Sequence, residues 1–213
     1  MSIGSSVRKL FGRHERYIAD LYRAAFVSLP DLIMQIYGFR QDPLEILELG
    51  CGEGAMTGLL ASRFAHSKIT ALDIAPNLGR LYEGAHEQVE FLQMDLPTFM
   101  SIYPLKRFDL VIMADVLHHV TENRTKLLEY ICDVMTPRGG FVLKDLDRSL
   151  HPVFLAAYLA DYYITGDRSV SFHAKEQLHQ MLTEVFGENA VSECSYVRPW
   201  KSNVVFFVDG GAR

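Results

Sequence analysis

Apolar positions follow two patterns that alternate along most of the chain. Short runs that are apolar nearly throughout predict buried strands, and positions that recur at helical spacing predict amphipathic helices. The predicted strands cover residues 44–49, 68–73, 89–93, 108–114, 141–143, 190–197 and 204–208. The predicted helices cover residues 56–64, 127–135 and 178–186, with further helices opened by Pro76, Pro97 and Pro152. This alternation predicts an α/β protein with a mostly parallel sheet.

The first 41 residues differ from the rest of the chain. Apolar side chains between Tyr17 and Phe26 form a helical stripe, and residues 8–23 carry five Lys or Arg against two Asp or Glu, a local charge of +3. A membrane-surface helix would fit this pattern, but we favour a cap packed over the mouth of the sheet. Pro30-Asp31 predicts a second short helix that ends near Gly38. We predict a helical cap over residues 1–41 and one domain over residues 42–213.

Composition and charge narrow the class of protein. At 213 residues the chain is long enough for one domain with a full core, and its net charge of −5 argues against general nucleic-acid binding. Cys51, Cys132 and Cys194 have no metal-ligand spacing, which is typical of a reduced cytosolic protein. The longest uninterrupted apolar run, residues 154–160, is far below the roughly 20 residues needed to span a bilayer. No signal peptide is visible. We therefore expect a cytoplasmic protein without stable membrane insertion.

The candidate chemistry begins with the sequence LELGCGEGA at residues 47–55, between a predicted strand and a predicted helix. Glycine suits such a turn because a Cβ would keep the backbone from closing on a ligand. The next strand ends at Asp73, where a carboxylate can accept both hydroxyls of a ribose. The loop also fits the dinucleotide pattern G-x-G-x-x-A, and a glycine turn without a ligand is a further alternative. Later motifs must therefore decide between cofactors.

Three later motifs follow in a fixed order. Asp95 follows the third predicted strand, FDLVIMADVLHHV covers residues 108–120, and Pro137-Arg138-Gly139-Gly140 ends the helix before the fifth strand. Together with the glycine loop and Asp73, this series resembles the class I S-adenosylmethionine-dependent methyltransferases, in the branch of compact single-domain enzymes that act on small molecules. The resemblance covers about residues 44–146. One departure is that Arg138 stands where the family commonly has glycine. A nicotinamide dehydrogenase fits less well, because the chain has no Tyr-x-x-x-Lys pair.

The resemblance implies a Rossmann-like sheet of seven strands in the order 3-2-1-4-5-7-6, mostly parallel with the last strand antiparallel, and helices on both faces. It also implies S-adenosylmethionine as cofactor. The loop glycines would carry the methionine portion, Asp73 the ribose hydroxyls, and Asp95 the adenine amine. Glu48 would orient the loop or the cofactor's amino group. The full set of implied cofactor-binding residues is Glu48, Gly50, Gly52, Gly54, Asp73, Ile74, Met94, Asp95, Leu96 and Asp115. Alternatively, Asp73 is a solvated strand-end residue and Asp95 only a helix cap.

Two adjacent histidines are the candidate catalytic residues. His118 and His119 follow the fourth predicted strand, at the sheet edge where α/β proteins bind their ligands. A histidine there can serve as general base because it titrates near neutrality. We favour His118 for this role and expect His119 to act on stability or cofactor binding; both could instead simply pack in the turn. Lys144 and Asp145 could pair with each other or contact the acceptor. No spacing predicts a metal site.

The acceptor is the least defined part of the prediction. An apolar cap rich in aromatic residues favours a lipophilic or aromatic small molecule, methylated on oxygen or carbon. An RNA or protein acceptor is the alternative, although the acidic chain shows no basic stripe with interleaved aromatics. A methyltransferase-like scaffold that binds without catalysis is a further alternative. The sequence leaves the oligomeric state open, a homodimer included.

Overall fold

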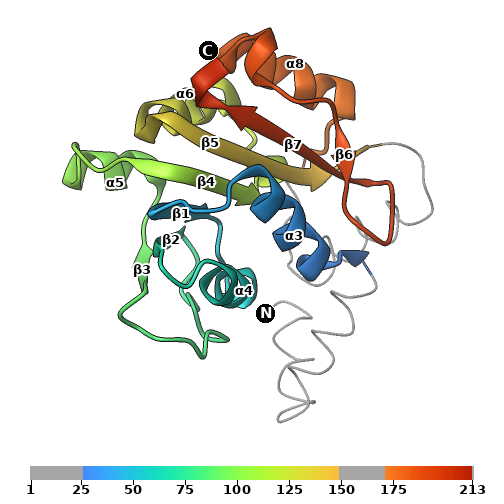
Figure 1. The fold of residues 1–213 in the computed structure, drawn as a ribbon. Coiled ribbons are helices and arrows are strands. Elements are labelled where there is room, and N and C mark those ends of the chain that lie inside the picture. The colour runs from blue at the N-terminus through green and yellow to red at the C-terminus, as the bar shows by residue number, and fades with distance from the viewer. Residues whose placement is uncertain (1–25, 149–170, 213) are drawn as a thin grey trace.

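The computed structural model describes residues 26–148 and 171–212 (Figure 1). Its strands are β1 (Glu45–Leu49), β2 (Lys68–Asp73), β3 (Val89–Gln93), β4 (Phe108–Ala114), β5 (Met135–Leu146), β6 (Ser195–Tyr196) and β7 (Asn203–Asp209). Its helices are α3 (Leu29–Phe39), α4 (Ala55–Arg63), α5 (Leu96–Ile102), α6 (Arg124–Val134) and α8 (Lys175–Phe186). Short 3₁₀ turns are η2 (Leu117–His119), η4 (Glu188–Ala190) and η5 (Gly210–Ala212).

All seven strands belong to one sheet in the order β3-β2-β1-β4-β5-β7-β6. β1 to β5 run parallel to one another, whereas β7 is antiparallel to β5 and β6 is antiparallel to β7. The fold class and strand order expected from the sequence are confirmed. Because β1 to β5 are parallel, their carboxyl ends meet at one edge, and the residues that follow them gather there.

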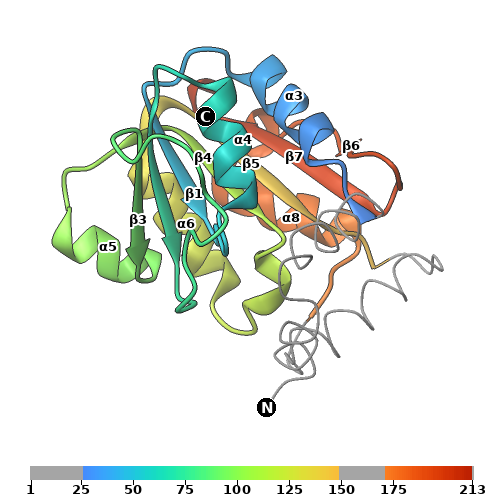
Figure 2. The ribbon, with the colours of Figure 1, turned by 90° about the horizontal axis from the view of Figure 1, so that it is seen from below.

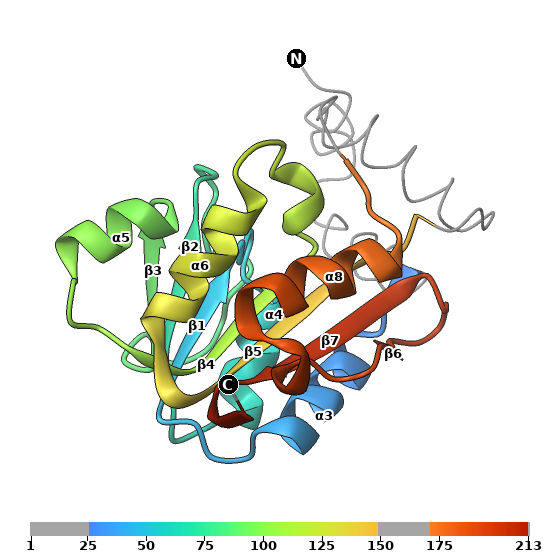
Figure 3. The same ribbon diagram turned by 90° about the horizontal axis from the view of Figure 1, so that it is seen from above.

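Helices cover both faces of the sheet. Figure 2 shows α3 and α4 on one face, and Figure 3 shows α5, α6 and α8 on the other. Successive side chains of β1 point to opposite faces, as a strand requires. Ile46 packs with buried residues of α3 and α4, while Leu47 and Leu49 pack with those of α5, α6 and α8. Two hydrophobic cores thus hold the central strands fixed from both sides, which explains why these strands read as nearly continuous apolar runs.

The helix predicted after Pro76 is wrong. Residues 74–88 form turns and bends between β2 and β3. Gly79 adopts a left-handed φ of +63°, and its N–H donates to Gly52 O at 3.0 Å, while Leu81 N–H donates to Glu53 O at 2.7 Å. A Cβ at position 79 would lie 2.8 Å from the ring of Phe91. The backbone of this segment therefore packs on the glycine loop. Two N–H groups that would donate within a helix donate instead to carbonyls of that loop.

Two predicted strand boundaries also need correction. The strand expected at residues 190–197 contains only β6 (Ser195–Tyr196), because the Ser192 hydroxyl, and not a backbone carbonyl, accepts the Phe207 N–H at 3.0 Å. The fifth strand begins at Met135, earlier than residue 141, and its pairing with β4 shifts register between Phe108 and Leu110. Pro137-Arg138-Gly139, where the sequence departs from the family pattern, thus lies within β5. The glycine of that turn, Gly139, has no room for a Cβ, which would lie 2.9 Å from Phe108 O.

Two predicted helices fall outside the described residues, namely the stripe at residues 17–26, apart from Phe26, and the helix after Pro152. The second helix of the expected cap is α3, which begins after Ser28, whose side chain accepts the Asp31 N–H at 3.3 Å. Leu32 and Ile36 of α3 are fully buried in the core shared with α4. A domain boundary after residue 41 stays a prediction.

Candidate active site at the carboxyl edge of the sheet

The glycine loop between β1 and α4 is a tight turn with bare backbone. Gly50, Gly52 and Gly54 have φ values of +74°, +50° and +86°, a region that L side chains rarely adopt. Both Gly50 N–H and Cys51 N–H donate to Leu72 O, at 2.8 and 3.2 Å, which ties the loop to the end of β2. A Cβ on Gly50 would lie 2.1 Å from Val116 Cγ2. Glycine is therefore required here by conformation and by space.

Asp73 lies at the end of β2 and faces the loop. Its Oδ2 accepts Gly52 N–H at 2.7 Å, and its Oδ1 accepts Ala75 N–H at 2.8 Å. A carboxylate has about four lone-pair sites, so each oxygen can accept a further hydrogen bond. Asp73 also lines the main cavity. The two backbone bonds hold the carboxylate in one orientation and leave acceptor capacity on both oxygens.

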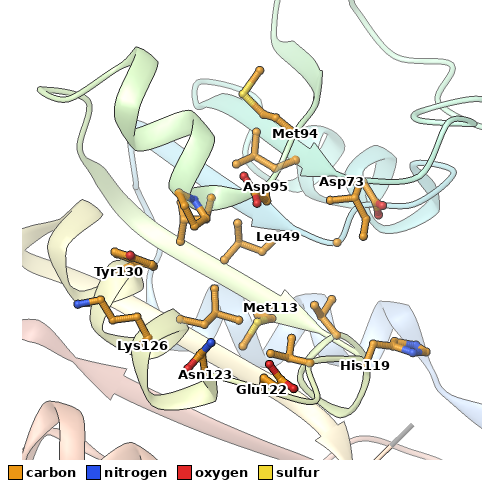
Figure 4. Close-up of a pocket in the computed structure, with 18 of the residues that line it drawn as sticks. Leu49, Asp73, Met94, Asp95, Met113, His119, Glu122, Asn123, Lys126 and Tyr130 are labelled. Carbon is orange, nitrogen blue, oxygen red and sulfur yellow. The ribbon is translucent and has the colours of Figure 1, made fainter. Parts of the chain in front are cut away.

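A cavity of about 830 Å³ runs along the ends of β1 to β4 (Figure 4). Met94 and Asp95 lie on one side of it, and Tyr130, Lys126 and Asn123 lie on the other. The predicted cofactor residues on its wall are Gly50, Asp73, Ile74, Met94, Asp95, Leu96 and Asp115. Seven residues predicted from separate motifs are thus brought together around one cavity.

Asp95 combines both interpretations left open by the sequence. Its Oδ1 accepts Thr98 N–H at 3.0 Å as the cap of α5. The Thr98 side chain, and then this backbone bond, lower the pKa of Asp95 below the usual range. The same carboxylate borders the main cavity. Capping fixes the position of Asp95 and keeps it ionised. A contact between Asp95 and a ligand stays a prediction.

Glu48 lies apart from the main cavity, in a smaller one of about 270 Å³ beneath the glycine loop. Burial raises the pKa of Glu48 to about 7; Thr57 opposes the rise and the charge of Asp73 adds to it. The Thr57 hydroxyl is close, but not in hydrogen-bond geometry, so within the described residues Glu48 Oε2 is buried without a partner. The remaining predicted residues, Gly52 and Gly54, lie in the loop above. Such an orphaned acceptor suits a cationic ligand group.

Asp115 borders both cavities, at the point where β4 ends. Its φ of +56° is left-handed, which is uncommon for a residue other than glycine and recurs at functional sites. Lys144 of β5 is buried and donates to both Asp115 oxygens, at 2.5 and 2.7 Å. Lys144 therefore pairs with Asp115 across the strands, and not with its neighbour Asp145.

Asp145 pairs with His118. Their Oδ1 and Nδ1 lie 2.6 Å apart, and the other carboxylate oxygen accepts the His118 N–H at 3.1 Å. Burial alone would raise the pKa of Asp145, but His118 and the Leu146 N–H lower it overall, so the residue is a carboxylate. His118 is buried and stacks on Phe172, with ring centroids 4.5 Å apart. This arrangement fixes Nδ1 as the donor to Asp145.

His119 lies beside His118 but contributes to the wall of the main cavity. The two ring centroids are 4.1 Å apart. Asp115, His118 and Asp145 could also offer metal ligands, since their donor atoms lie within 4.8 Å of one another. However, Lys144 already occupies Asp115, and His118 and Leu146 occupy Asp145, so a metal would have to displace these partners.

The fold and the site can be compared with known proteins. A methyltransferase-domain family matches residues 46–139. The malonyl-[acyl-carrier protein] O-methyltransferase of Paenibacillus sp. (strain JDR-2) is 37% identical over 177 residues, covering 78% of this chain and 63% of that protein. The ubiquinone biosynthesis O-methyltransferase of Rickettsia felis is 28% identical, covering 77% and 69%. The plantazolicin methyltransferase BpumL, solved with a monoazolic desmethylPZN analogue and SAH, has a TM-score of 0.68 at 15% identity, and the match covers 97% of this chain and 94% of BpumL.

The chain thus matches a methyltransferase domain over residues 46–139 and has the fold of solved methyltransferases. The malonyl-[acyl-carrier protein] relatives from Paenibacillus and Halalkalibacterium are longer proteins, of which it spans about three fifths. The residues present fit the family's cofactor: a glycine cradle that a Cβ would fill, a strand-end carboxylate with spare acceptor capacity, and the unpaired Glu48 oxygen. In the described part of the chain, no helix has the length and apolarity needed to cross a membrane.

One wall of the cavity was not predicted from the sequence. Glu122, Asn123, Lys126, Leu127 and Tyr130, from the start of α6, line the cavity opposite Asp95. A signal was available, because the helix that follows the fourth strand begins at the same sheet edge as the cofactor loop. Its polar residues at helical spacing therefore had to face either solvent or the cavity.

Proposed function

We propose that this methyltransferase transfers the methyl group of S-adenosylmethionine to an oxygen or carbon atom of a small acceptor with an apolar or aromatic body. The observation that carries the proposal is the wall of the main cavity, which includes both Asp73 and His119. One cavity thus offers acceptors for an adenosine and, through His119, borders the buried pair of His118 and Asp145. When bound, the cofactor supplies a methyl group already activated on a sulfonium, so the chain has chiefly to bind and align the reactants.

The proposed cofactor contacts follow from the hydrogen-bonding capacity that each residue retains. The spare lone pairs of Asp73 would accept ribose hydroxyls, and Asp95 would accept the adenine amine. Ile74, Met94 and Leu96 supply apolar surface for the ring. The buried Glu48 would accept a hydrogen bond from the ammonium group, which favours its ionised form.

We further propose His118 as the base that accepts the acceptor's proton, with Asp145 as its positioning residue. Asp145 holds Nδ1 at 2.6 Å, which leaves Nε2 as the ring's proton acceptor. The Asp145 carboxylate also stabilises the imidazolium that forms when His118 takes a proton. His119, whose ring contacts that of His118, would form the wall between this pair and the cofactor.

A small acceptor is supported by the cavity and by the relatives. Apolar side chains such as Val116, Val120 and Leu127 line much of the cavity. Two of the relatives are named as O-methyltransferases of malonyl-[acyl-carrier protein] and of ubiquinone biosynthesis. A tRNA adenine methyltransferase from Vibrio cholerae is also 30% identical, over 55% of this chain. The net charge of −5 makes an RNA acceptor the weaker candidate.

The test is methyl transfer from radiolabelled cofactor to two panels of acceptors. One panel contains phenols, hydroxyquinones and carboxylic acids, and the other contains tRNA transcripts and unfolded protein. We expect label in the first panel only, with the labelled product identified by mass spectrometry. Label found only in tRNA or protein would contradict the proposal. Cofactor binding without transfer to either panel would favour the non-catalytic scaffold.

A further inference from the structure

Arg124 has an unusual pair of unsatisfied donors. It is the first residue of α6, and its Nε and Nη2 atoms are both buried without a hydrogen-bond partner. The N–H of Nε and one N–H of Nη2 point in the same direction, and this edge of a guanidinium matches the two oxygens of a carboxylate or phosphate. The unsatisfied atoms of Arg124 are therefore the two that form a bidentate donor.

Arg40 and Arg198, two other arginines of the described residues, have carboxylate partners, although Arg40 Nε is also buried without a hydrogen-bond partner. Arg40 Nη2 donates to Asp209 Oδ1 at 2.8 Å, and Arg198 pairs with Asp31 at 2.9 Å. None of the ion pairs found within residues 26–148 and 171–212 involves Arg124. Leaving buried donors of a charged group unpaired is costly, so native structures rarely keep such groups without an unseen ligand or ion.

Arg148 and the start of α6 add positive charge near Arg124. Burial lowers the pKa of His173, and the positive charges of Arg124 and Arg148 lower it further, although Asp145 opposes them. Arg124 also stands at the amino end of α6, where the N-cap residue Asn123 is left-handed and makes no side-chain capping bond. The free N–H groups of a helix start add partial positive charge. Both features favour an anion near Arg124.

The position of Arg124 connects it to the proposed acceptor side of the site. Its neighbours Glu122 and Asn123 line the main cavity, and Arg124 directly follows them in sequence without lining the cavity itself. His173, whose charge responds to Arg124, directly follows Phe172, which stacks on His118. An anion held by Arg124 would therefore lie beside the histidines, and away from Asp73 and the glycine loop on the cofactor side.

We propose that the Nε–Nη2 edge of Arg124 binds a carboxylate of the acceptor and so anchors the substrate for methyl transfer. This inference rests on the proposed function, because it names the acceptor class of the same site as a small organic acid. The planar edge favours a carboxylate; a phosphate monoester shares the same chemistry and is compared directly in the test. The anchored group is a second polar group of the acceptor, distinct from the atom that receives the methyl group.

The experiment titrates protein saturated with S-adenosylhomocysteine with three probes: benzoate, phenyl phosphate and neutral benzamide. The readout is the arginine Nε–H signal in ¹⁵N-edited NMR, assigned to Arg124 by its loss in Arg124→Lys. We expect benzoate to shift this signal at lower concentration than phenyl phosphate, and benzamide to leave it in place. Calorimetry should show benzoate binding at least tenfold weaker in Arg124→Lys, which keeps the charge but loses the bidentate edge, and undetectable in Arg124→Gln.

Arg107→Lys is the matched control, because Arg107 is exposed and donates to the carbonyls of Pro104 and Lys106, in the connection between α5 and β4. It should leave benzoate affinity unchanged, and all three variants should bind S-adenosylhomocysteine and melt like the wild type. Unchanged benzoate affinity in Arg124→Lys and Arg124→Gln would overturn the inference, as would a signal that no probe shifts. Stronger binding of phenyl phosphate would assign the site to a phosphorylated acceptor and overturn the carboxylate. If the wild-type protein does not bind S-adenosylhomocysteine, the proposed function is contradicted. Titration of the ligand-free protein with the same anions would then still show whether Arg124 binds a carboxylate.

Discussion

The two halves of the site are built on different physical plans. At the ends of β1 and β2, the glycine loop and Asp73 present backbone and one carboxylate, and the bonds between them stay within a short stretch of chain. At the ends of β4 and β5, four side chains satisfy one another in two buried or half-buried pairs, Asp115 with Lys144 and His118 with Asp145. In the first half the carboxylate can still accept hydrogen bonds from a ligand. In the second half each charged side chain is already paired with another side chain of the protein.

This difference has a consequence for substitutions. Loss of the Asp73 carboxylate in the first half should act mainly on the proposed ligand contact, because no buried charge in the described residues depends on it for pairing. A change in the second half leaves a partner charge buried, so it acts on stability and on reactivity together. The following substitutions separate the two halves, from the largest expected effect to the smallest.

The largest effect is expected for the proposed base. His118→Ala should lower turnover at least about a hundredfold, because a general base typically contributes 10²–10⁴ in rate. Asp145→Asn should lower turnover in the same direction, since the amide can present an N–H to Nδ1 and favour the other tautomer. Cofactor affinity should remain close to wild type in both. The measurement is a pH–rate profile with an identified acceptor, in which His118→Ala loses the limb that reports the base.

His119→Ala is the matched comparison for that experiment, since it removes the neighbouring ring from the cavity wall. It should change the Michaelis constant or cofactor affinity more than the maximal rate. If His119→Ala instead lost the pH limb and His118→Ala kept it, the base would be the histidine on the cavity wall. Near-normal turnover in both variants would remove histidine base catalysis and leave alignment alone.

The Asp115–Lys144 pair should show the largest effect on stability. Asp115→Asn removes the charge but keeps a residue that tolerates the left-handed backbone, and it leaves the Lys144 ammonium buried at 2% exposure. We expect a loss of about 3 kcal/mol in the free energy of unfolding, at the low end for a broken buried pair. Lys144→Met should cost less, about 1–2 kcal/mol, because the Asp115 side chain is 40% exposed and can be hydrated.

Urea unfolding of both variants, with and without S-adenosylhomocysteine, measures this difference. Equal losses would indicate that the charge of Lys144 is not what makes the pair costly to break. A stabilised Lys144→Met variant would show that apolar packing at this position outweighs the pair, as happens for some buried ion pairs.

The cofactor half should respond mainly in affinity. Asp73→Ala should weaken binding of S-adenosylhomocysteine by about 1–3 kcal/mol, the range for polar groups left unpaired. Asp95→Ala removes a helix cap, so it should also cost roughly 1 kcal/mol of stability. Calorimetry and urea unfolding of the two variants separate ligand contact from capping. Unchanged affinity in Asp73→Ala, or binding of a nicotinamide dinucleotide by the wild type, would contradict the cofactor assignment.

The same contrast explains how much of the molecule could be predicted from the sequence. The strand order followed from motifs whose residues are local, such as the glycine loop with Asp73, and the structure brings those residues together. The pairing of Lys144 with Asp115, and not with Asp145, could not be predicted, because it depends on the register between β4 and β5. The turns after Pro76 were missed for a similar reason, since their donors reach the glycine loop and not the next helical turn. Arg124 gave no signal in sequence, because an unpaired donor is visible only in three dimensions.

The smallest effect concerns Glu48, the one acid of the cofactor half that is buried without a partner for Oε2. Its pKa is about 7 in the folded protein against an ordinary value of 4.5, so between these pH values the folded state holds a proton that the unfolded state has released. The contribution of Glu48 to the free energy of unfolding should therefore fall as pH rises from 4.5 to 7 and change no further above that range.

Glu48→Gln removes this titration and should stabilise the ligand-free protein at pH 8 by at least about 1 kcal/mol, with no gain at pH 4. A cationic ligand group against Glu48 would favour the ionised acid, so saturation with S-adenosylhomocysteine should reduce or reverse the gain at pH 8. Urea unfolding of the wild type and the variant at both pH values, with and without that ligand, measures the gain under each of the four conditions. A gain that is equal at pH 4 and pH 8 would show that Glu48 does not titrate in this range, and a gain unaffected by the ligand would place the ammonium group elsewhere.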